Sequence, residues 1–241
     1  GGGDGQDALV VSAKEIALAK KFKAALAAYA TGEREAAHEI FRELLGEDKA
    51  TIEQKTWAHF HFGLSDLLDG KEESATKRFK AASGLGAVMK EPAPAFFSRC
   101  ATILEPKKAI PQSELNQLQG GEIFGLACFP YGLKNWLNGD YRGAKEFFSL
   151  YADTQFTAEN QWMGKYDSYL EPYLADADLL LDLPKLTADL SIQDLRSVIE
   201  KVGGIKDQLK GDQGSEVLVK IQDEANLLIK TKEEDQRRKL A

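Results

Sequence analysis

The sequence contains few residues that could form a disulfide framework or hold a metal. Its 241 residues include only two cysteines and three histidines. Two cysteines are too few for a disulfide framework or a zinc set, and the pairing of Cys100 with Cys128 stays open because it depends on export from the cytosol. His59 and His61 are two positions apart, so on a helix they point in nearly opposite directions and do not share a metal. We therefore predict no metal site.

The sequence also lacks long apolar runs and any excess of basic residues. No stretch of about 18 apolar residues occurs, so we expect no insertion into a membrane. The formal net charge is -7, and an acidic surface disfavours both nucleic acid and anionic lipid as the main partner. With 43% hydrophobic residues the chain can nevertheless form a sizeable core. These numbers indicate a soluble protein of one or two domains.

Motifs that would indicate an enzyme are absent as well. No glycine-rich phosphate loop follows a strand pattern, and no nucleophile elbow is present. Acidic pairs such as Asp176 with Asp178, or Glu72 with Glu73, are expected on solvated helix faces rather than as a catalytic acid and base. We therefore predict that the protein is not an enzyme and that it has neither catalytic residues nor a cofactor.

What the sequence does contain is helical periodicity. From Asp7 to about Ala30, apolar residues recur every three or four positions among strong helix formers. Gly32 interrupts this pattern with the residue type that commonly ends a helix, and a second helical pattern follows. Alternating runs of β-branched residues are scarce, so we expect no strands. The sequence predicts an all-α protein.

Three segments repeat a common pattern around a turn glycine. Gly32, Gly70 and Gly139 are about 38 and 69 residues apart, which is close to one and two periods of about 34. Gly63 and Gly132 precede the second and third turns, follow aromatic residues and would let two helices approach closely. The pattern predicts stacked antiparallel helical hairpins, because one pair alone cannot bury its apolar face. An alanine and a phenylalanine follow each turn glycine with the same spacing: Ala37 and Phe41, Ala75 and Phe79, and Ala144 and Phe148.

These residues resemble the tetratricopeptide repeat family over about residues 13–82 and 125–151. The resemblance implies a right-handed superhelix in which the first helix of each pair lines a concave face. It also implies non-catalytic protein–protein interaction, as a scaffold or adaptor. Residues 85–120, which contain four of the seven prolines, are expected to be a degenerate part of the repeat domain. The matching positions are Phe62, Gly63, Gly70, Ala75 and Phe79 in one copy, Tyr131, Gly132, Gly139, Tyr141, Ala144 and Phe148 in another, and, more weakly, Gly32, Ala37 and Phe41.

The resemblance further implies that nine residues line the concave face and form an apolar groove for a protein or peptide partner. The Lys, Arg and Asn set with which some family members clamp a peptide carboxylate is missing there, so we do not expect chaperone C-termini as partners. A groove this apolar does not stay open to water. Either a partner's apolar peptide or helix occupies it, or the chain fills it from within, with the helix at Val217 to Ile229 as the candidate. The nine residues are Phe22, Leu26, Tyr29, Trp57, Phe60, Leu64, Phe129, Leu133 and Trp136.

The expected organisation has three parts. Residues 1–7 form a flexible leader, residues 8–185 the helical repeat domain and residues 186–241 a C-terminal helical hairpin. Two other functions stay open: an enzyme of helical-toroid fold that acts on an extended polymer such as glycan, and a structural subunit that forms homo-oligomers through its C-terminal helices. The start with Gly-Gly-Gly in place of Met favours an exported, periplasmic protein.

Overall fold

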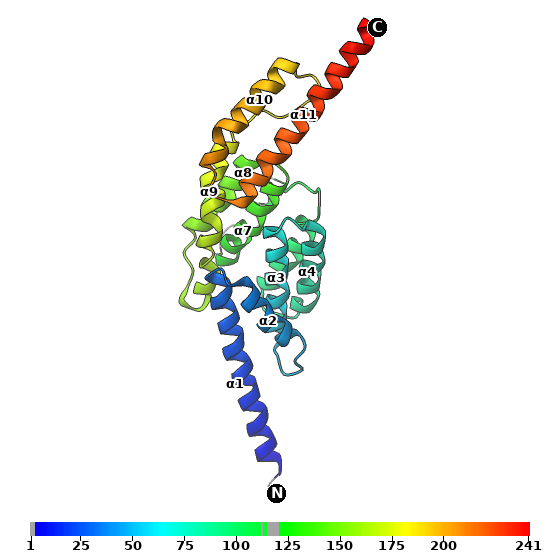
Figure 1. Cartoon of the computed structure of the whole chain (residues 1–241). Helices are drawn as coiled ribbons and strands as arrows, with labels where there is room; N and C mark the ends of the chain where they lie inside the picture. Colours follow the sequence, from blue (N-terminus) through cyan, green and yellow to red (C-terminus); the bar gives the residue numbers. More distant parts are fainter. Residues whose placement is uncertain (1–2, 112, 115–120) are drawn as a thin grey trace. The chain divides into compact units, whose positions relative to one another are not determined.

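The computed structural model describes residues 3–111, 113–114 and 121–241, with side chains from residue 13 onwards. Within these ranges the chain is helical and contains no strand, which confirms the predicted fold class (Figure 1). The α-helices are α1 (Gly3–Ala30), α2 (Arg34–Leu45), α3 (Ile52–Leu68), α4 (Glu72–Gly86), α5 (Ala93–Ile103), α7 (Glu122–Leu137), α8 (Tyr141–Asp153), α9 (Asp167–Leu180), α10 (Ile192–Ile205) and α11 (Asp212–Leu240). Two 3₁₀-helices are η1 (Ala158–Gly164) and η2 (Lys206–Gln208).

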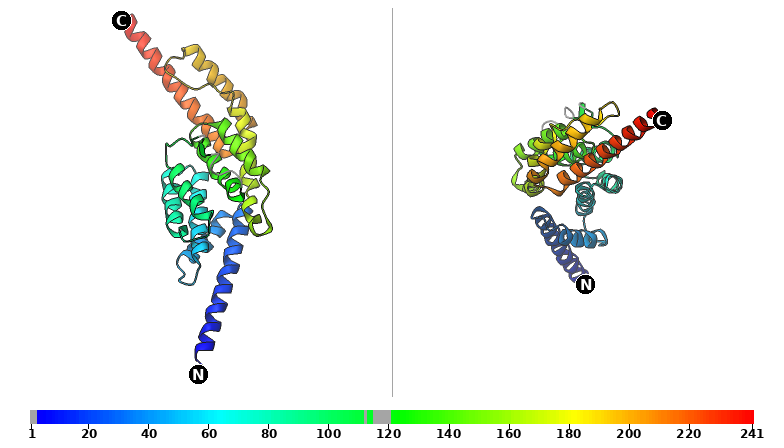
Figure 2. Two further views of the ribbon diagram at one scale, coloured as in Figure 1. Left: turned by 180° about the vertical axis from the view of Figure 1, so that it is seen from behind. Right: turned by 45° about the horizontal axis from the view of Figure 1, so that its top comes forward.

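The chain folds into two compact units, Gly1–Ser168 and Tyr169–Ala241. The first unit holds α1 to α8 and η1, and the second holds α10, α11 and nearly all of α9. Figure 2 shows the same helices from two further directions. The boundary that the sequence suggested, between residues 185 and 186, lies inside the second unit, in the connection from α9 to α10.

Glycine ends the first helix of each of three hairpins in the first unit, α1 with α2, α3 with α4, and α7 with α8. The backbone φ angles are 88° at Gly32, 76° at Gly70 and 80° at Gly139, in the left-handed region that glycine adopts without steric cost. Two backbone hydrogen bonds close the first turn, from Gly32 N to Tyr29 O and from Glu33 N to Ala28 O. The same pair of bonds recurs at the other two turns, so the prediction that these glycines end helices is confirmed.

Two further glycines let the paired helices approach each other closely, as the sequence predicts. A Cβ atom on Gly63 would lie 2.8 Å from the ring of Phe79, and one on Gly132 would lie 2.4 Å from the ring of Phe148. Both rings are fully buried against the first helix of their own hairpin. In the first hairpin, Phe41 instead stacks on a ring of α3, and so joins two hairpins.

The proline-rich segment after α4 contains a short helix, α5, that belongs to the first unit. α5 begins two residues after Glu91, within the proline-containing part expected to be degenerate, and packs against α4. Beyond it, Lys134 of α7 is fully buried and donates to Glu72 Oε2 at 2.7 Å and to the carbonyl oxygen of Glu105 at 2.6 Å. Since a buried ammonium needs such partners, this contact fixes α7 to the start of α4 and to the residues that directly follow α5.

The second unit is built around the pair α10 and α11, whose apolar faces meet through Leu195, Val198 and Leu218 among others. The connection before α11 is held by Asp176 of α9, which accepts from the backbone N–H groups of Lys210 and Gly211 at 2.7 and 2.8 Å. Asp176 is almost completely buried. The expectation that Asp176 lies on a solvated helix face is therefore wrong. Its buried carboxylate accepts hydrogen bonds from backbone N–H groups that would otherwise need water as their partner.

Candidate functional site

The nine residues expected to line an apolar groove lie mostly in the core of the first unit. Eight of them are buried, and Phe22 alone is half-buried. A partner could reach most of these side chains only by displacing other parts of the chain; Trp57, which is 3% exposed, also lines a cleft. The buried residues are Leu26, Tyr29, Trp57, Phe60, Leu64, Phe129, Leu133 and Trp136. We refer to all nine as the aromatic row.

A segment between α8 and α9, residues 156–166, covers the aromatic row from within the first unit. The ring of Tyr166 lies 5.7 Å from that of Tyr29 and 5.5 Å from that of Phe129, so one side chain joins α1 to α7. This arrangement agrees with the interpretation that the chain fills the groove itself. The filler suggested by the sequence, Val217 to Ile229, belongs to the second unit, and its place against the row stays a prediction.

His61 anchors this covering segment, a role that its sequence position, weighed only for metal binding, does not indicate. Its Nδ1 lies 2.7 Å from the carbonyl oxygen of Trp57 and its Nε2 lies 2.5 Å from the hydroxyl of Tyr166. Burial lowers the pKa of His61 to about 4, so the ring is neutral at pH 7. The carbonyl can only accept, which makes Nδ1 the donor and leaves Nε2 to accept from Tyr166.

Glu122, the first residue of α7, holds the other end of the covering segment. Its carboxylate accepts from the side-chain amide of Asn160 at 2.5 Å and from the backbone N–H of Thr157, which precedes η1. These hydrogen bonds, that from Asn160 above all, lower the pKa of Glu122. The segment is therefore attached both to the aromatic core and to the start of α7.

An open cleft of about 690 Å³ lies beside the covering segment. Four parts of the first unit form it: the start of α3 with Glu53 and Trp57, the connection between α4 and α5 with Met89 to Ala93, the start of α7, and η1. A cleft of this volume is in the usual range for a ligand site. Two other clefts of the first unit are smaller, at about 600 and 120 Å³.

The cleft combines an aromatic floor with carboxylates. Trp57 and Trp162 meet edge to face with ring centroids 4.8 Å apart, and Met89 and Met163 lie beside them. The described lining residues include four glutamates, Glu53, Glu91, Glu122 and Glu159, but a single basic residue, Lys90. The described lining of the cleft therefore carries more negative than positive charge, and low-dielectric walls focus the field of such like charges.

Trp57 brings a hydrogen-bond donor to this cleft. Its side chain is only 3% exposed, and its indole N–H makes no hydrogen bond to any described residue. No fully buried side-chain nitrogen or oxygen of the described residues lacks a partner. The N–H of Trp57 therefore keeps some contact with solvent, and Trp57 is among the residues that line the cleft.

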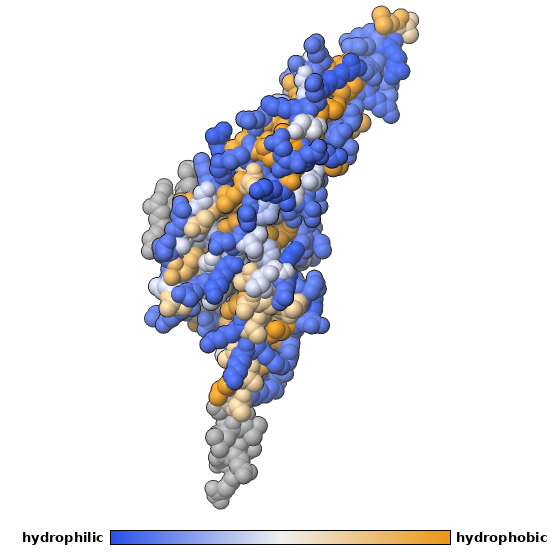
Figure 3. All heavy atoms as spheres, turned by 60° about the vertical axis from the view of Figure 1, so that its left-hand side comes forward, coloured by the Kyte–Doolittle hydropathy of each residue, from blue (hydrophilic) through white to orange (hydrophobic). Residues whose placement is uncertain are grey.

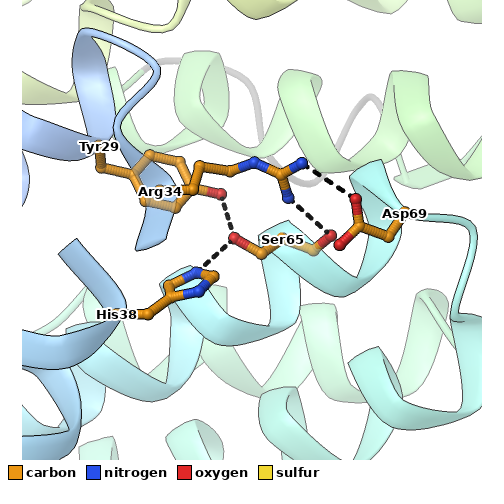
Figure 4. Close-up of polar contacts among 5 residues, drawn as sticks. All are labelled: Tyr29, Arg34, His38, Ser65 and Asp69. Carbon is orange, nitrogen blue, oxygen red and sulfur yellow. Dashed lines mark hydrogen bonds and ion pairs between the residues drawn. The ribbon is translucent and has the colours of Figure 1, made fainter. Parts of the chain in front are cut away.

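A second polar cluster lies where α1, α2 and α3 meet (Figure 4). The Ser65 hydroxyl lies 2.9 Å from the Tyr29 hydroxyl and 2.8 Å from His38 Nε2. The Asp69 carboxylate, which a catalytic triad would need against the histidine, accepts from Arg34 at 3.0 Å. Ser65 is buried, so a substrate does not reach its oxygen. We interpret this cluster as a polar contact that fixes the first hairpin to the second.

Cys100 and Cys128 are free, and both are buried. Burial raises the pKa of Cys128 to about 12 and that of Cys100 further, so neither side chain is a thiolate at neutral pH. In the part of the chain that the structure describes, no three His, Cys, Asp or Glu side chains are grouped as metal ligands would be. Neither cysteine therefore adds chemistry to the cleft.

No protein-family model, no curated protein and no solved structure matches the chain. Among the described residues, no helix is both long and apolar enough to cross a membrane. The visible face in Figure 3 is mainly hydrophilic, with hydrophobic residues in separate groups.

Proposed function

We propose that the protein is a non-catalytic interaction scaffold, similar to tetratricopeptide repeat proteins, which binds a peptide segment of a partner protein. The hairpins support the repeat interpretation, because glycine with positive φ ends the first helix of each pair. The close contacts of Gly63 with Phe79 and of Gly132 with Phe148 support it further, because both follow from one sequence pattern.

The observation that carries the proposal is the open cleft between the start of α3 and η1. The aromatic row is largely buried, whereas the cleft is open and combines indole rings with polar groups. Tryptophan is enriched where protein interfaces bind most strongly, since it offers a large apolar face together with a donor. The partner is therefore expected in the cleft and not along the row.

Selection from a random peptide library on the immobilised full chain tests this function. We expect enriched peptides whose binding is lost in Trp162→Ala, which removes half of the cleft floor. Phe22→Ala is the matched control, because Phe22 is the half-buried member of the row and should leave binding unchanged. Thermal unfolding of both variants verifies that they are folded. Failure to enrich any peptide, or loss of binding only in Phe22→Ala, would contradict the proposal.

An enzyme acting on glycan is the second candidate, because sugar rings also stack on tryptophan and carboxylates can hydrolyse glycosidic bonds. The cleft supplies both kinds of residue in Trp162, Glu91 and Glu159. Release of reducing ends from neutral oligosaccharides measures this activity. We expect none from the native chain. Release that disappears in Glu159→Gln would favour the enzyme over the scaffold.

A further inference from the structure

We propose that the cleft recognises a positively charged side chain, arginine or lysine, in an extended peptide. The inference rests on the proposed interaction function and names the chemistry that its site selects. Three features of the cleft support it: the charge of its rim, the half-buried ring of Trp162 and the donor on Trp57.

The rim of the cleft carries carboxylates that nothing in the described chain neutralises. Glu122 is occupied by Thr157 and Asn160, as described above. Glu53, Glu91 and Glu159 are exposed, and none of the three makes a hydrogen bond or an ion pair with a described residue. They come from α3, the connection before α5 and η1, so they surround the cleft instead of following one helix. A neutral ligand would not need three carboxylates without partners, whereas a guanidinium offers five donors to them.

The floor of the cleft suits a cation as well. A guanidinium or ammonium over the face of tryptophan is attracted by the ring quadrupole, and tryptophan is the strongest of the aromatic side chains in this respect. Trp162 is half-buried, and Trp57 contacts it edge to face. The molecule already contains such a contact elsewhere, where Arg78 lies 4.5 Å from the ring centroid of Phe62.

The N–H of Trp57 favours a peptide over a free cation as the ligand of the cleft. A metal ion or a simple amine offers no acceptor to this donor, but each residue of a peptide carries a backbone carbonyl. An extended peptide whose cationic side chain lies among the glutamates can place a carbonyl oxygen near the indole. The peptide carbonyl thereby accepts a hydrogen bond from the Trp57 N–H, a donor that the rest of the fold leaves to water.

Calorimetric titration of the full chain with three probes tests the inference. The probes are a capped twelve-residue peptide with three arginines in a glycine–serine background, its counterpart with three glutamines, and a neutral glucan hexasaccharide. We expect the arginine peptide to bind at least about tenfold more tightly than the other two, with an affinity that falls as salt is raised.

Variants of the native chain locate the binding. The double change Glu91→Gln and Glu159→Gln should weaken the arginine peptide by about tenfold or more, because it removes two charges at nearly constant shape. Glu39→Gln is the matched control, since Glu39 is an exposed glutamate on α2 away from the cleft. Trp57→Phe keeps an aromatic ring but deletes the donor, and should weaken the peptide several-fold without changing the effect of salt.

The outcomes separate this inference from the proposed function. Equal binding of the glutamine peptide, or tighter binding of the hexasaccharide, overturns the choice of a cation. Library peptides that carry no excess of arginine or lysine yet depend on Trp162 leave the interaction function intact and overturn the inference alone. An arginine peptide whose affinity is the same in the double glutamine variant and in Glu39→Gln also overturns it.

Discussion

Two regions of the first unit contain clustered aromatic residues, and they differ in what surrounds the rings. In the aromatic row, rings meet other rings, as Tyr166 does with Tyr29 and Phe129. In the cleft, the rings of Trp57 and Trp162 lie beside unpaired carboxylates. From this difference we infer that apolar residues at helical spacing indicate a core, whereas aromatic residues next to charges without partners indicate a binding site. Variants of the two regions should therefore affect different measurements.

The largest expected effect comes from the aromatic row. Phe129→Ala removes a fully buried ring from α7 and should lower the free energy of unfolding by about 3–5 kcal/mol. Denaturant unfolding measures this change. Leu150→Ala is the control: Leu150 is 42% exposed, so its loss should cost far less. If Phe129→Ala costs no more than Leu150→Ala, the row is an open surface and the comparison fails.

The anchor of the covering segment gives the next effect, which depends on pH. The pKa of His61 is lowered by burial from 6.5 to about 4 in the folded protein. The unfolded chain therefore binds a proton first as the pH falls, so stability is complete above pH 6.5 and is lost between pH 6.5 and 4. The loss from this group should reach about 3 kcal/mol at pH 4.

Unfolding free energies of native protein and His61→Gln, measured across this pH range, test that expectation. Glutamine does not titrate, so the variant should lose less stability than the native protein as the pH falls. His38 and His59, whose pKa values burial also lowers, remain in both proteins and provide a common background. Identical pH profiles would show that His61 is not buried in neutral form.

A smaller effect is expected where helices approach closely. Gly132→Ala places a Cβ atom 2.4 Å from the ring of Phe148, so the ring must move. The variant should lose about 1–2 kcal/mol, because overpacking outweighs the better helix propensity of alanine. Gly84→Ala in α4 is the control, since a Cβ there meets nothing within 4 Å and should stabilise the protein by up to about 1 kcal/mol. Stabilisation by both changes would mean that the hairpin is looser than described.

The smallest effect on stability belongs to the rim of the cleft. Glu91→Gln and Glu159→Gln change exposed side chains without partners, so together they should shift the free energy of unfolding by no more than about 0.5 kcal/mol. The same variants should weaken peptide binding strongly. Loss of stability comparable with that of Phe129→Ala would show that these carboxylates support the fold and do not form a free rim.

The sequence predicts the hairpins well because their determinants are local. A turn that needs positive φ is marked by glycine, as at Gly70, and a close helix contact is marked by a missing side chain, as at Gly63. The cleft cannot be predicted in the same way because its parts are distant in sequence. The anchor of the covering segment beside it is similar: His61 is hydrogen-bonded to Tyr166 across 105 positions, and no periodic pattern indicates that contact. The burial of Asp176 cannot be predicted from the sequence pattern either, since its partners are backbone groups.

Amide hydrogen exchange of the native chain, with and without a peptide selected from the library, tests the central claim most directly. If the cleft takes the partner, the peptide slows exchange in residues 89–93 and 159–163, which form two of its walls. Exchange in residues 22–29 and 129–136, which contain six of the nine residues of the aromatic row, then stays as it was. Slowing along the row with no change at the cleft would contradict the account.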